Sequence, residues 1–588
     1  MSSPSYLVTP SKTNLRSWAL RQQLSVLTPL EALRNKRFLS SGAVSQRLHD
    51  LHTELILIVE DLLPLNTGAA TTAGELWKAL QYRKAVALHE TISIYTTPGY
   101  LLAEIQRKPQ ALALYNVEQE LIQQVRHAHG TMELYKRQRE LSHHQLVIMN
   151  SEPILKSLVE KRLCLGATMS DLDCMAVLAQ PHFGRKNNLI FVDWLRYHDF
   201  FFILGYNATS KSLVLYDMIR KFNVRDAHEW VMENILKPQR KNPAEAPMIY
   251  NPPLAKLLSL VKPIHKFVKP GDILVFSPTG ILNSIPLHAI PFESEDDYPV
   301  IYHNPVIYSS SNAVMRDCVD RAVQLCASSS PWKGAFYGDL RMPTTHPMED
   351  ASVRRSVEAL SARFGDGTAV AVTGSKLNRK TFKEHLSDST LVHFHGHTGG
   401  GTINRGLKME PLAIEDIKNS DYYRQLWYES GCRSRDTGLF TVQDIFLANL
   451  NAPLVTLMAC SSSEQDVGQS DDPIGLISAL LTAGASSVIG MRRSLRLYIQ
   501  VRLTFVHTGT LWPTDSSDGR AFSEIFYQEA FLAKPAPISN LALAMQKTVL
   551  KLRADGDEEH PRPPFHWAQF VLRNTFPLFG VQIVDVFE

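Results

Sequence analysis

Two side chains suited to acyl-transfer chemistry follow two short apolar segments of this chain. LVHFHGHTGG at residues 391–400 contains His397, and LVTLMACSSSEQD at residues 454–466 contains Cys460. A thiol within hydrogen-bonding reach of an imidazole can act as a nucleophile, because the imidazole accepts the thiol proton and later protonates the leaving amine. These residues therefore predict a cysteine peptidase that works through an acyl-enzyme, with Cys460 and His397 as its dyad.

The segments that carry these side chains have the composition of buried strands. Residues 391–394 and 454–458 are short apolar runs bounded by small residues, as is typical of strands covered on both faces. Parallel strands deliver their last residues to the carboxyl edge of a sheet, where α/β proteins place their chemistry. We therefore expect His397 and Cys460 at one edge of the same sheet.

Strand-like and helix-like segments alternate from Pro270 to the end of the chain, which predicts a mostly parallel sheet sandwiched by helices. The expected strands are residues 273–276, 306–308, 334–338, 368–372, 391–394, 454–458 and 487–490. Three β-rich runs between residues 189 and 218 predict a small antiparallel meander before this sheet.

The chain of 588 residues is too long for a single core and divides into three expected domains. Residues 1–165 carry apolar stripes with helical spacing and are expected to be all-α. Because the sequence shows no clean repeat, this region could form either degenerate tetratricopeptide-like (TPR-like) repeats or a plain helical bundle. Residues 166–262 are expected to form a small α+β subdomain that contains the meander. Residues 263–588 are expected to form the catalytic domain.

Composition narrows the class of protein. A formal net charge of +3 gives no argument for nucleic acid or for an anionic membrane, and no apolar run is long enough for a transmembrane helix. Widely spaced cysteines suit reduced thiols in a cytoplasmic protein better than disulfides. They are Cys164, Cys174, Cys318, Cys326, Cys432 and Cys460.

Two patterns allow a different interpretation. His393, His395 and His397 would share one face of a strand and resemble a metal site, but no carboxylate stands at a recognisable ligand spacing, so we expect neither metal nor cofactor. Residues 1–30 lack acidic side chains and weakly match a transit peptide. We expect instead a flexible arm that leads into a helix at residues 14–27.

Several longer stretches match one known family in order and in sequence. They are GDILVFSPTGILNSIPLHAIPF (271–292), PVIYSSSNAVM (305–315), DTGLFTVQDIF (436–446), LVTLMAC with DPIGLISALLTAGASSVIG (454–460 and 472–490), and HPRPPFHWAQFVL (560–572). Over residues 188–588 they resemble the CHAT domain, a caspase-like cysteine peptidase family related to caspases and separases. The resemblance implies a caspase-like fold and assigns the catalytic histidine and cysteine to His397 and Cys460.

The resemblance also implies how a substrate would be held. The backbone amides of Thr398 and Cys460 are the candidate oxyanion donors, and Gly396 would let the backbone approach the substrate, although the family has glycine where this chain has Thr398. A second departure is MRRS at residues 491–494, where the family often has SLWPV. Acidic residues after the nucleophile would either receive a basic substrate side chain or form a solvated loop that caps the helix expected from residue 472. The candidates are Glu464, Asp466 and Asp471.

The expected function is a regulated, cytoplasmic cysteine endopeptidase that cleaves specific proteins. The family resemblance implies substrates within immunity or programmed cell death, including gasdermin-like effectors, and an activating protein that binds the amino-terminal helical region. The alternative is a catalytically inactive CHAT scaffold that acts as a protein-interaction module, which the Thr398 departure favours.

Overall fold

The computed structural model describes most of the chain between residues 84 and 573. The described residues are 84–85, 88–89, 92, 96–97, 99–127, 131–163, 172–173, 175–176, 187–197, 199–236, 253–294, 298–327, 333–340, 347–365, 367–399, 405–411, 415, 438–448, 450, 452–459, 465–467, 473–491, 516–531, 540–555, 562 and 564–573.

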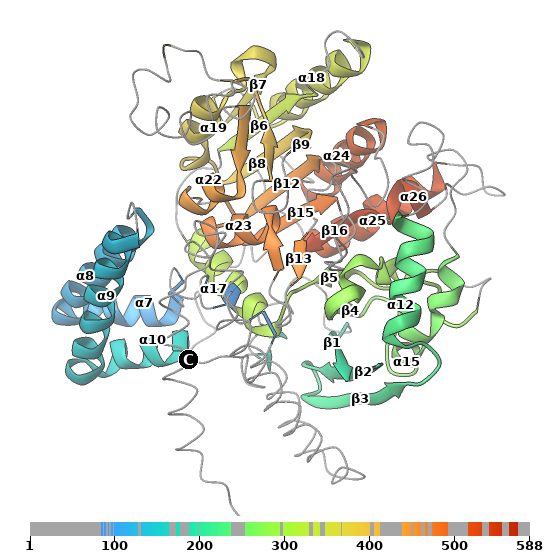
Figure 1. The fold of residues 1–588 in the computed structure, drawn as a ribbon, viewed down its shortest axis with the longest axis horizontal. Helices are drawn as coiled ribbons and strands as arrows, with labels where there is room; N and C mark the ends of the chain where they lie inside the picture. Colours follow the sequence, from blue (N-terminus) through green and yellow to red (C-terminus); the bar gives the residue numbers. More distant parts are fainter. Residues whose placement is uncertain are drawn as a thin grey trace, which may run out of the picture.

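Within the described residues, eleven strands form one sheet through the middle of the molecule, in the order β3-β2-β1-β4-β5-β16-β15-β12-β8-β6-β7 (Figure 1). Their bounds are β1 Leu189–Tyr197, β2 Phe200–Asn207, β3 Ser212–Ile219, β4 Ile273–Ser277, β5 Val306–Tyr308, β6 Gly334–Asp339, β7 Ala369–Thr373, β8 Leu391–Gly396, β12 Leu454–Ala459, β15 Ser487–Met491 and β16 Phe570–Arg573. All seven strands expected after residue 270 are present in this sheet. The predicted fold class, a mostly parallel α/β sheet, is confirmed.

The antiparallel meander is the edge of the same sheet. Strand β1 pairs with β4 in parallel from Leu189↔Ile273 to Asp193↔Ser277, while β2 pairs antiparallel with both β1 and β3. The sheet therefore continues across residue 262, where a boundary between two domains was expected.

Strand β16 was not predicted and joins the two halves of the sheet. It lies between β5 and β15, parallel to the first at Arg573↔Tyr308 and antiparallel to the second. The sequence hides this strand because it is only four residues long and follows an aromatic, proline-rich stretch.

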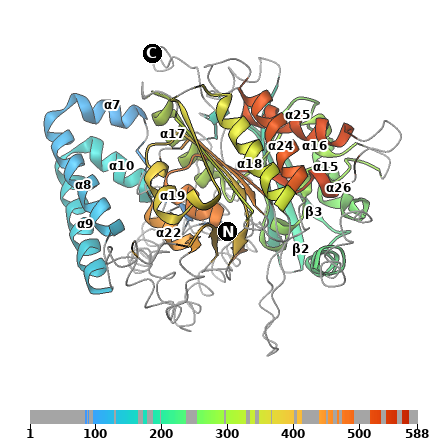
Figure 2. The same cartoon turned by 90° about the horizontal axis from the view of Figure 1, so that it is seen from above.

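Helices cover both faces of the sheet (Figure 2). One face carries α17 (Asn312–Ala327), α19 (Arg379–Leu386), α22 (Val442–Leu447) and α23 (Leu476–Ala483). The other face carries α18 (Pro347–Ala362), α24 (Ser516–Ala530) and α25 (Leu541–Ala554). Two large apolar clusters result, one on each face.

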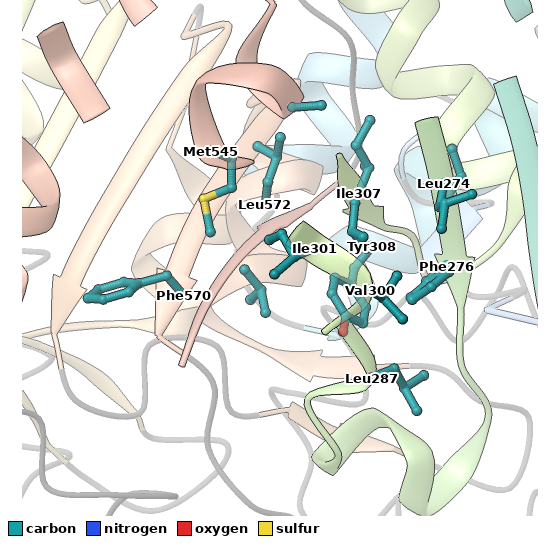
Figure 3. Close-up of a cluster of buried hydrophobic side chains, with 14 of the residues drawn as sticks. Leu274, Phe276, Leu287, Val300, Ile301, Ile307, Tyr308, Met545, Phe570 and Leu572 are labelled. Atoms are coloured by element: carbon teal, nitrogen blue, oxygen red, sulfur yellow. The ribbon is translucent and has the colours of Figure 1, made fainter. Parts of the chain in front are cut away.

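Figure 3 shows the packing around β4, β5 and β16. Leu274 and Ile307 from the sheet, Ile301 from α16 (Val300–His303) and Met545 from α25 belong to one buried cluster. Each such side chain gains about 1.5–3 kcal/mol on leaving water. This burial holds the parallel strands, which makes their carboxyl ends a rigid platform.

Four helices form a separate layer beside the sheet unit (Figure 1). They are α7 (Gly99–Arg107), α8 (Pro109–His127), α9 (Thr131–Ser151) and α10 (Pro153–Leu163). Proline stands at the first position of α8 and of α10, where its missing N–H costs no hydrogen bond. Leu101, Ile105 and Leu158 lie in a small apolar cluster of their own. The described part of the amino-terminal region is thus helical, and TPR-like repeats remain a prediction.

The remaining elements are short. They are α12 Val224–Val231, η1 Met232–Leu236, η2 Leu254–Leu260, α15 Lys262–His265, η3 Gly280–Ser284, η4 Leu287–Ala289, η5 Gly374–Lys376 and α26 Pro564–Trp567, with strands β9 Thr398–Gly399, β10 Gly406–Lys408, β11 Leu439–Thr441, β13 Gln465–Val467 and β14 Pro473–Gly475. Among the described helices, none has the length and apolar character needed to cross a bilayer.

Candidate active site

The two strands that precede the predicted dyad are neighbours in register. Strands β8 and β12 pair in parallel over six residues, from Leu454↔Leu391 to Ala459↔Gly396. His397 is the next residue after Gly396, and Cys460 is the next residue after Ala459. The prediction that both strands end at one edge is therefore confirmed, whereas Cys460 itself lies outside the described residues.

Gly396 has a structural role at this edge. It closes β8 and lies opposite Asp339, the last residue of β6. A Cβ at this position would lie 2.8 Å from the Asp339 carbonyl oxygen and 2.9 Å from Cζ of Phe394. Such distances are too short for any side chain, so the close approach of β6 and β8 requires glycine.

The chain after His397 forms a small second sheet. Strand β9 pairs antiparallel with β10, which pairs with β11, and the Lys408 N–H donates to the His397 carbonyl oxygen over 2.8 Å. Hydrogen-bonded and non-hydrogen-bonded residue pairs alternate along an antiparallel ladder. Since Lys408 donates to His397, the next pair, Thr398 and Leu407, exchanges no backbone hydrogen bonds. The Thr398 N–H is consequently directed away from β10, an orientation compatible with the expected oxyanion role.

The imidazole of His397 is neutral at physiological pH. Burial, together with the positive charge of Lys408, lowers its pKa to about 4 against the opposing effect of Asp350. Its Nε2 is buried and has no hydrogen-bond partner within the described part of the chain. A neutral ring nitrogen in this position can accept a proton from a nucleophile.

Two carboxylates near His397 were missed by the sequence analysis. Asp339 ends β6 beside Gly396, and Asp350 lies on α18 and accepts a hydrogen bond from the Leu340 N–H over 2.8 Å. Arg354 reaches both, 2.6 Å from Asp350 Oδ2 and 3.4 Å from Asp339 Oδ1. The available signal was that an acidic residue directly follows the expected strand at 334–338.

The other two histidines of β8 are buried packing residues. Nδ1 of His393 lies 3.3 Å from the hydroxyl of Tyr527, which donates to Thr456 over 3.2 Å. A Cβ added to Gly519 of α24 would lie 3.2 Å from His395, so this ring packs tightly against α24. Burial lowers the pKa of both histidines and keeps them neutral. Among the residues that the structure describes, no three ligating side chains converge on a metal position.

The predicted substrate-binding acids are only partly placed. Asp466 lies in β13, opposite Ile474 of β14, and the structure describes its backbone alone. Glu464 and Asp471 lie outside the described residues. Their role as a pocket for a basic side chain stays a prediction.

Comparison with known families agrees with the resemblance drawn from the sequence. The architecture defines a mixed α/β protein with a mostly parallel sheet. Residues 251–504 match the family model of the CHAT domain. No curated protein matched the chain significantly.

Solved structures share features of the fold at low identity. The separase in the separase–securin complex of Saccharomyces cerevisiae is 10% identical with a TM-score of 0.41, covering 90% of this chain and 40% of the separase chain. The Arg-specific cysteine proteinase gingipain R is 11% identical with a TM-score of 0.32, covering 60% of this chain and 76% of that chain. This chain thus spans less than half of the separase chain. At these TM-scores the likenesses carry no argument about activity.

Proposed function

We propose that this protein is a regulated cysteine endopeptidase in which Cys460 is the nucleophile and His397 the general base. The observation that carries the proposal is the register of β8 and β12, which ends with Ala459 opposite Gly396 and lies inside the CHAT-matching region. A neutral His397 supports the same assignment, because only the neutral ring can take the thiol proton.

The proposed reaction uses groups of this chain alone. His397 accepts the proton from Sγ of Cys460, and the sulfur attacks the scissile carbonyl carbon to form a tetrahedral oxyanion. The C–N bond then breaks, and His397 returns the proton to the leaving amine. Water, deprotonated by His397, finally hydrolyses the thioester and releases the acid.

Backbone amides would stabilise the oxyanion. The Thr398 N–H faces away from β10, and the turn after Gly396 would bring it toward the carbonyl oxygen. Losing one such donor typically reduces the rate by about 10² to 10³. The Cβ of Thr398 narrows this approach relative to glycine.

The proposed substrates are proteins cleaved at selected sites. Glu464, Asp466 and Asp471 follow the nucleophile in sequence and would give a preference for a basic side chain. Asp339, which closes the strand next to β8, is a further acid at the same edge. We further propose that the substrates are immune or cell-death effectors of the gasdermin type. The proposed location is the cytoplasm, and the proposed activator is a protein that binds helices α7–α10.

The alternative proposal is an inactive CHAT scaffold. The observation in its favour is Thr398, which fills the position where the family has glycine. In that case the sheet unit would serve protein interaction, and Cys460 would show no enhanced reactivity.

An irreversible active-site probe separates the two proposals. A peptidyl acyloxymethyl ketone with arginine next to the warhead should add once to the wild type and not to Cys460→Ala or His397→Ala, as measured by intact mass. Cys318→Ala is the matched control and should label like the wild type, because burial raises the pKa of the Cys318 thiol to about 12. Absence of the adduct with arginine and aliphatic probes, with and without cell extract, would favour the scaffold.

A further inference from the structure

A segment that precedes the helical layer packs inside the α/β unit. Ala85, Leu88 and Ile92 are buried in the same apolar cluster as Leu457 of β12 and Ile477 of α23. Residues 88, 89 and 92 are helical, and a spacing of four residues places Leu88 and Ile92 on one helix face, while Ala85 lies in the turn before them. This face therefore completes the core behind a strand that ends at the candidate active site.

A buried ion pair and a buried histidine–carboxylate contact fix the same segment to the α/β unit. Nζ of Lys84 lies 2.5 Å from Asp193 of β1, and it also donates to the carbonyl oxygen of Ser277, the last residue of β4. Nδ1 of His89 lies 2.8 Å from Asp317 of α17. Burial alone would raise the pKa of Asp317, but the neighbouring Arg316 and His89 outweigh it and lower the pKa to about 2. Because the Lys84–Asp193 pair is buried, salt in the solvent screens it much less than a surface pair.

Arg321 connects this segment to α23, which follows the proposed nucleophile in the sequence. Its Nη2 donates to Thr96 Oγ1 over 3.1 Å, and Nη1 donates to the carbonyl oxygens of Leu481 and Ala485 at 2.5 and 3.1 Å. These carbonyls lie at the carboxyl-terminal end of α23 and in the turn that follows. A guanidinium there gives the carbonyls at this helix end additional charged donors and opposes the negative end of the helix dipole.

Helix α23 extends from Arg321 to the chain that follows the proposed nucleophile. It is preceded directly by β14, which pairs with β13, and β13 begins five residues after Cys460. All eight residues of α23 are buried, and eight residues span about 12 Å. At the carboxyl-terminal end of α23, which Arg321 contacts, Gly484 has φ +134°, and a Cβ there would lie 1.9 Å from the Leu450 carbonyl oxygen. The helix is therefore continuous with the β13–β14 hairpin and packs against both of its strands.

We propose that Arg321 is a positioning residue that links residues 84–97 to the β13–β14 hairpin through α23. Helix α7 starts at Gly99, immediately after this segment, and packs against α17. Displacement of the helical layer withdraws Thr96 from Arg321, which loosens the end of α23 and shifts the hairpin next to the nucleophile. This inference deepens the proposed function, since it supplies the route by which a protein bound to α7–α10 would regulate Cys460.

The link itself can be tested without catalysis. Thr96→Val removes the hydroxyl that Arg321 contacts and keeps the shape of the side chain. Hydrogen–deuterium exchange should become about tenfold faster in residues 478–486, as expected on loss of a hydrogen bond to a charged group. Thr97→Val is the matched control. It removes a hydroxyl from the neighbouring position, but that hydroxyl lies 3.0 Å from the Tyr115 hydroxyl of α8, whereas Arg321 donates to Thr96. Equal exchange in residues 478–486 for Thr96→Val and the wild type would overturn the proposal.

A second readout tests the effect on the nucleophile. Thr96→Val should lower the maximal rate of probe addition to Cys460 about fivefold or more, while the concentration of probe giving half that rate stays constant. Arg321→Met should give the larger loss, and Arg321→Lys, which keeps a charged donor, should recover part of it. Unchanged addition rates in Thr96→Val and Arg321→Met would refute the regulatory role. A wild type that takes no probe would instead refute the proposed function, and the exchange experiment would still decide the link.

Discussion

Acidification should destabilise this protein through the buried histidines of β8, and His393 offers the clearest test. Its side chain is fully buried in the sheet, and burial lowers its pKa to about 3, against 6.5 in an unfolded chain. Between these values the unfolded state binds a proton that the folded state excludes. Stability is therefore fully present above pH 6.5 and is lost as pH falls toward 3.

The size of the effect follows from this difference. Each pH unit below 6.5 costs about 1.4 kcal/mol per histidine. Lowering the pH from 7 to 5 should thus remove about 2 kcal/mol through His393 alone. The pKa values of His395 and His397 are lowered in the same direction, so the three together should remove several kcal/mol. Such a loss is comparable with the whole stability of many domains, about 5–15 kcal/mol.

The assay compares His393→Gln with the wild type by guanidinium unfolding at pH 7 and pH 5. Glutamine can still hydrogen-bond to the Tyr527 hydroxyl but cannot titrate, so the loss of stability between the two pH values should shrink by about 2 kcal/mol. His143→Gln on α9 is the matched control, because the His143 side chain is exposed in the folded protein as well. If His393→Gln and the wild type lose equal stability, His393 does not titrate as its burial requires, and the reasoning fails.

Two further variants test single features of the fold and the site. Gly484→Ala should lower the free energy of unfolding by about 3–5 kcal/mol, since a Cβ there would collide with the Leu450 carbonyl oxygen. Gly367→Ala, at φ +78° but in open space, should lower it by only about 1–2 kcal/mol. Similar shifts of the melting temperature in both variants would contradict the steric explanation. Lys408→Gln removes a positive charge that lowers the pKa of His397, so this pKa should rise and the acid limb of Cys460 labelling should move to higher pH. A limb that stays in place would show that Lys408 does not act on His397.

Much of the candidate site could be predicted from local sequence. Residues 391–394 and 454–458 were expected to be strands, and β8 and β12 include them. The positions of His397 and Cys460 after these strands follow directly from the chain. Short apolar runs bounded by small residues identify buried strands because burial on both faces leaves no polar alternation, and that information lies within a few neighbouring residues.

Other features depend on pairing between distant parts of the chain. Asp339 lies beside Gly396 only because β6 pairs with β8, and no local pattern sets that strand order. The meander joins the main sheet through the β1–β4 pairing, and β16 enters between β5 and β15. Each of these contacts is selected by the shapes and apolar areas of two surfaces far apart in sequence.

The sequence by itself determined the strand-and-helix alternation and the two residues proposed for catalysis, because both follow from local periodicity and from the chemistry of single side chains. Only the tertiary structure decided the protonation of His393 and His397, since burial and neighbouring charges set their pKa values. It also decided that Ala85, Leu88 and Ile92 join the apolar cluster of β12, because the same apolar side chains could have covered either the helical layer or the sheet. The ion pair of Lys84 with Asp193 and the bonds of Arg321 to Thr96 and α23 hold these side chains against the sheet.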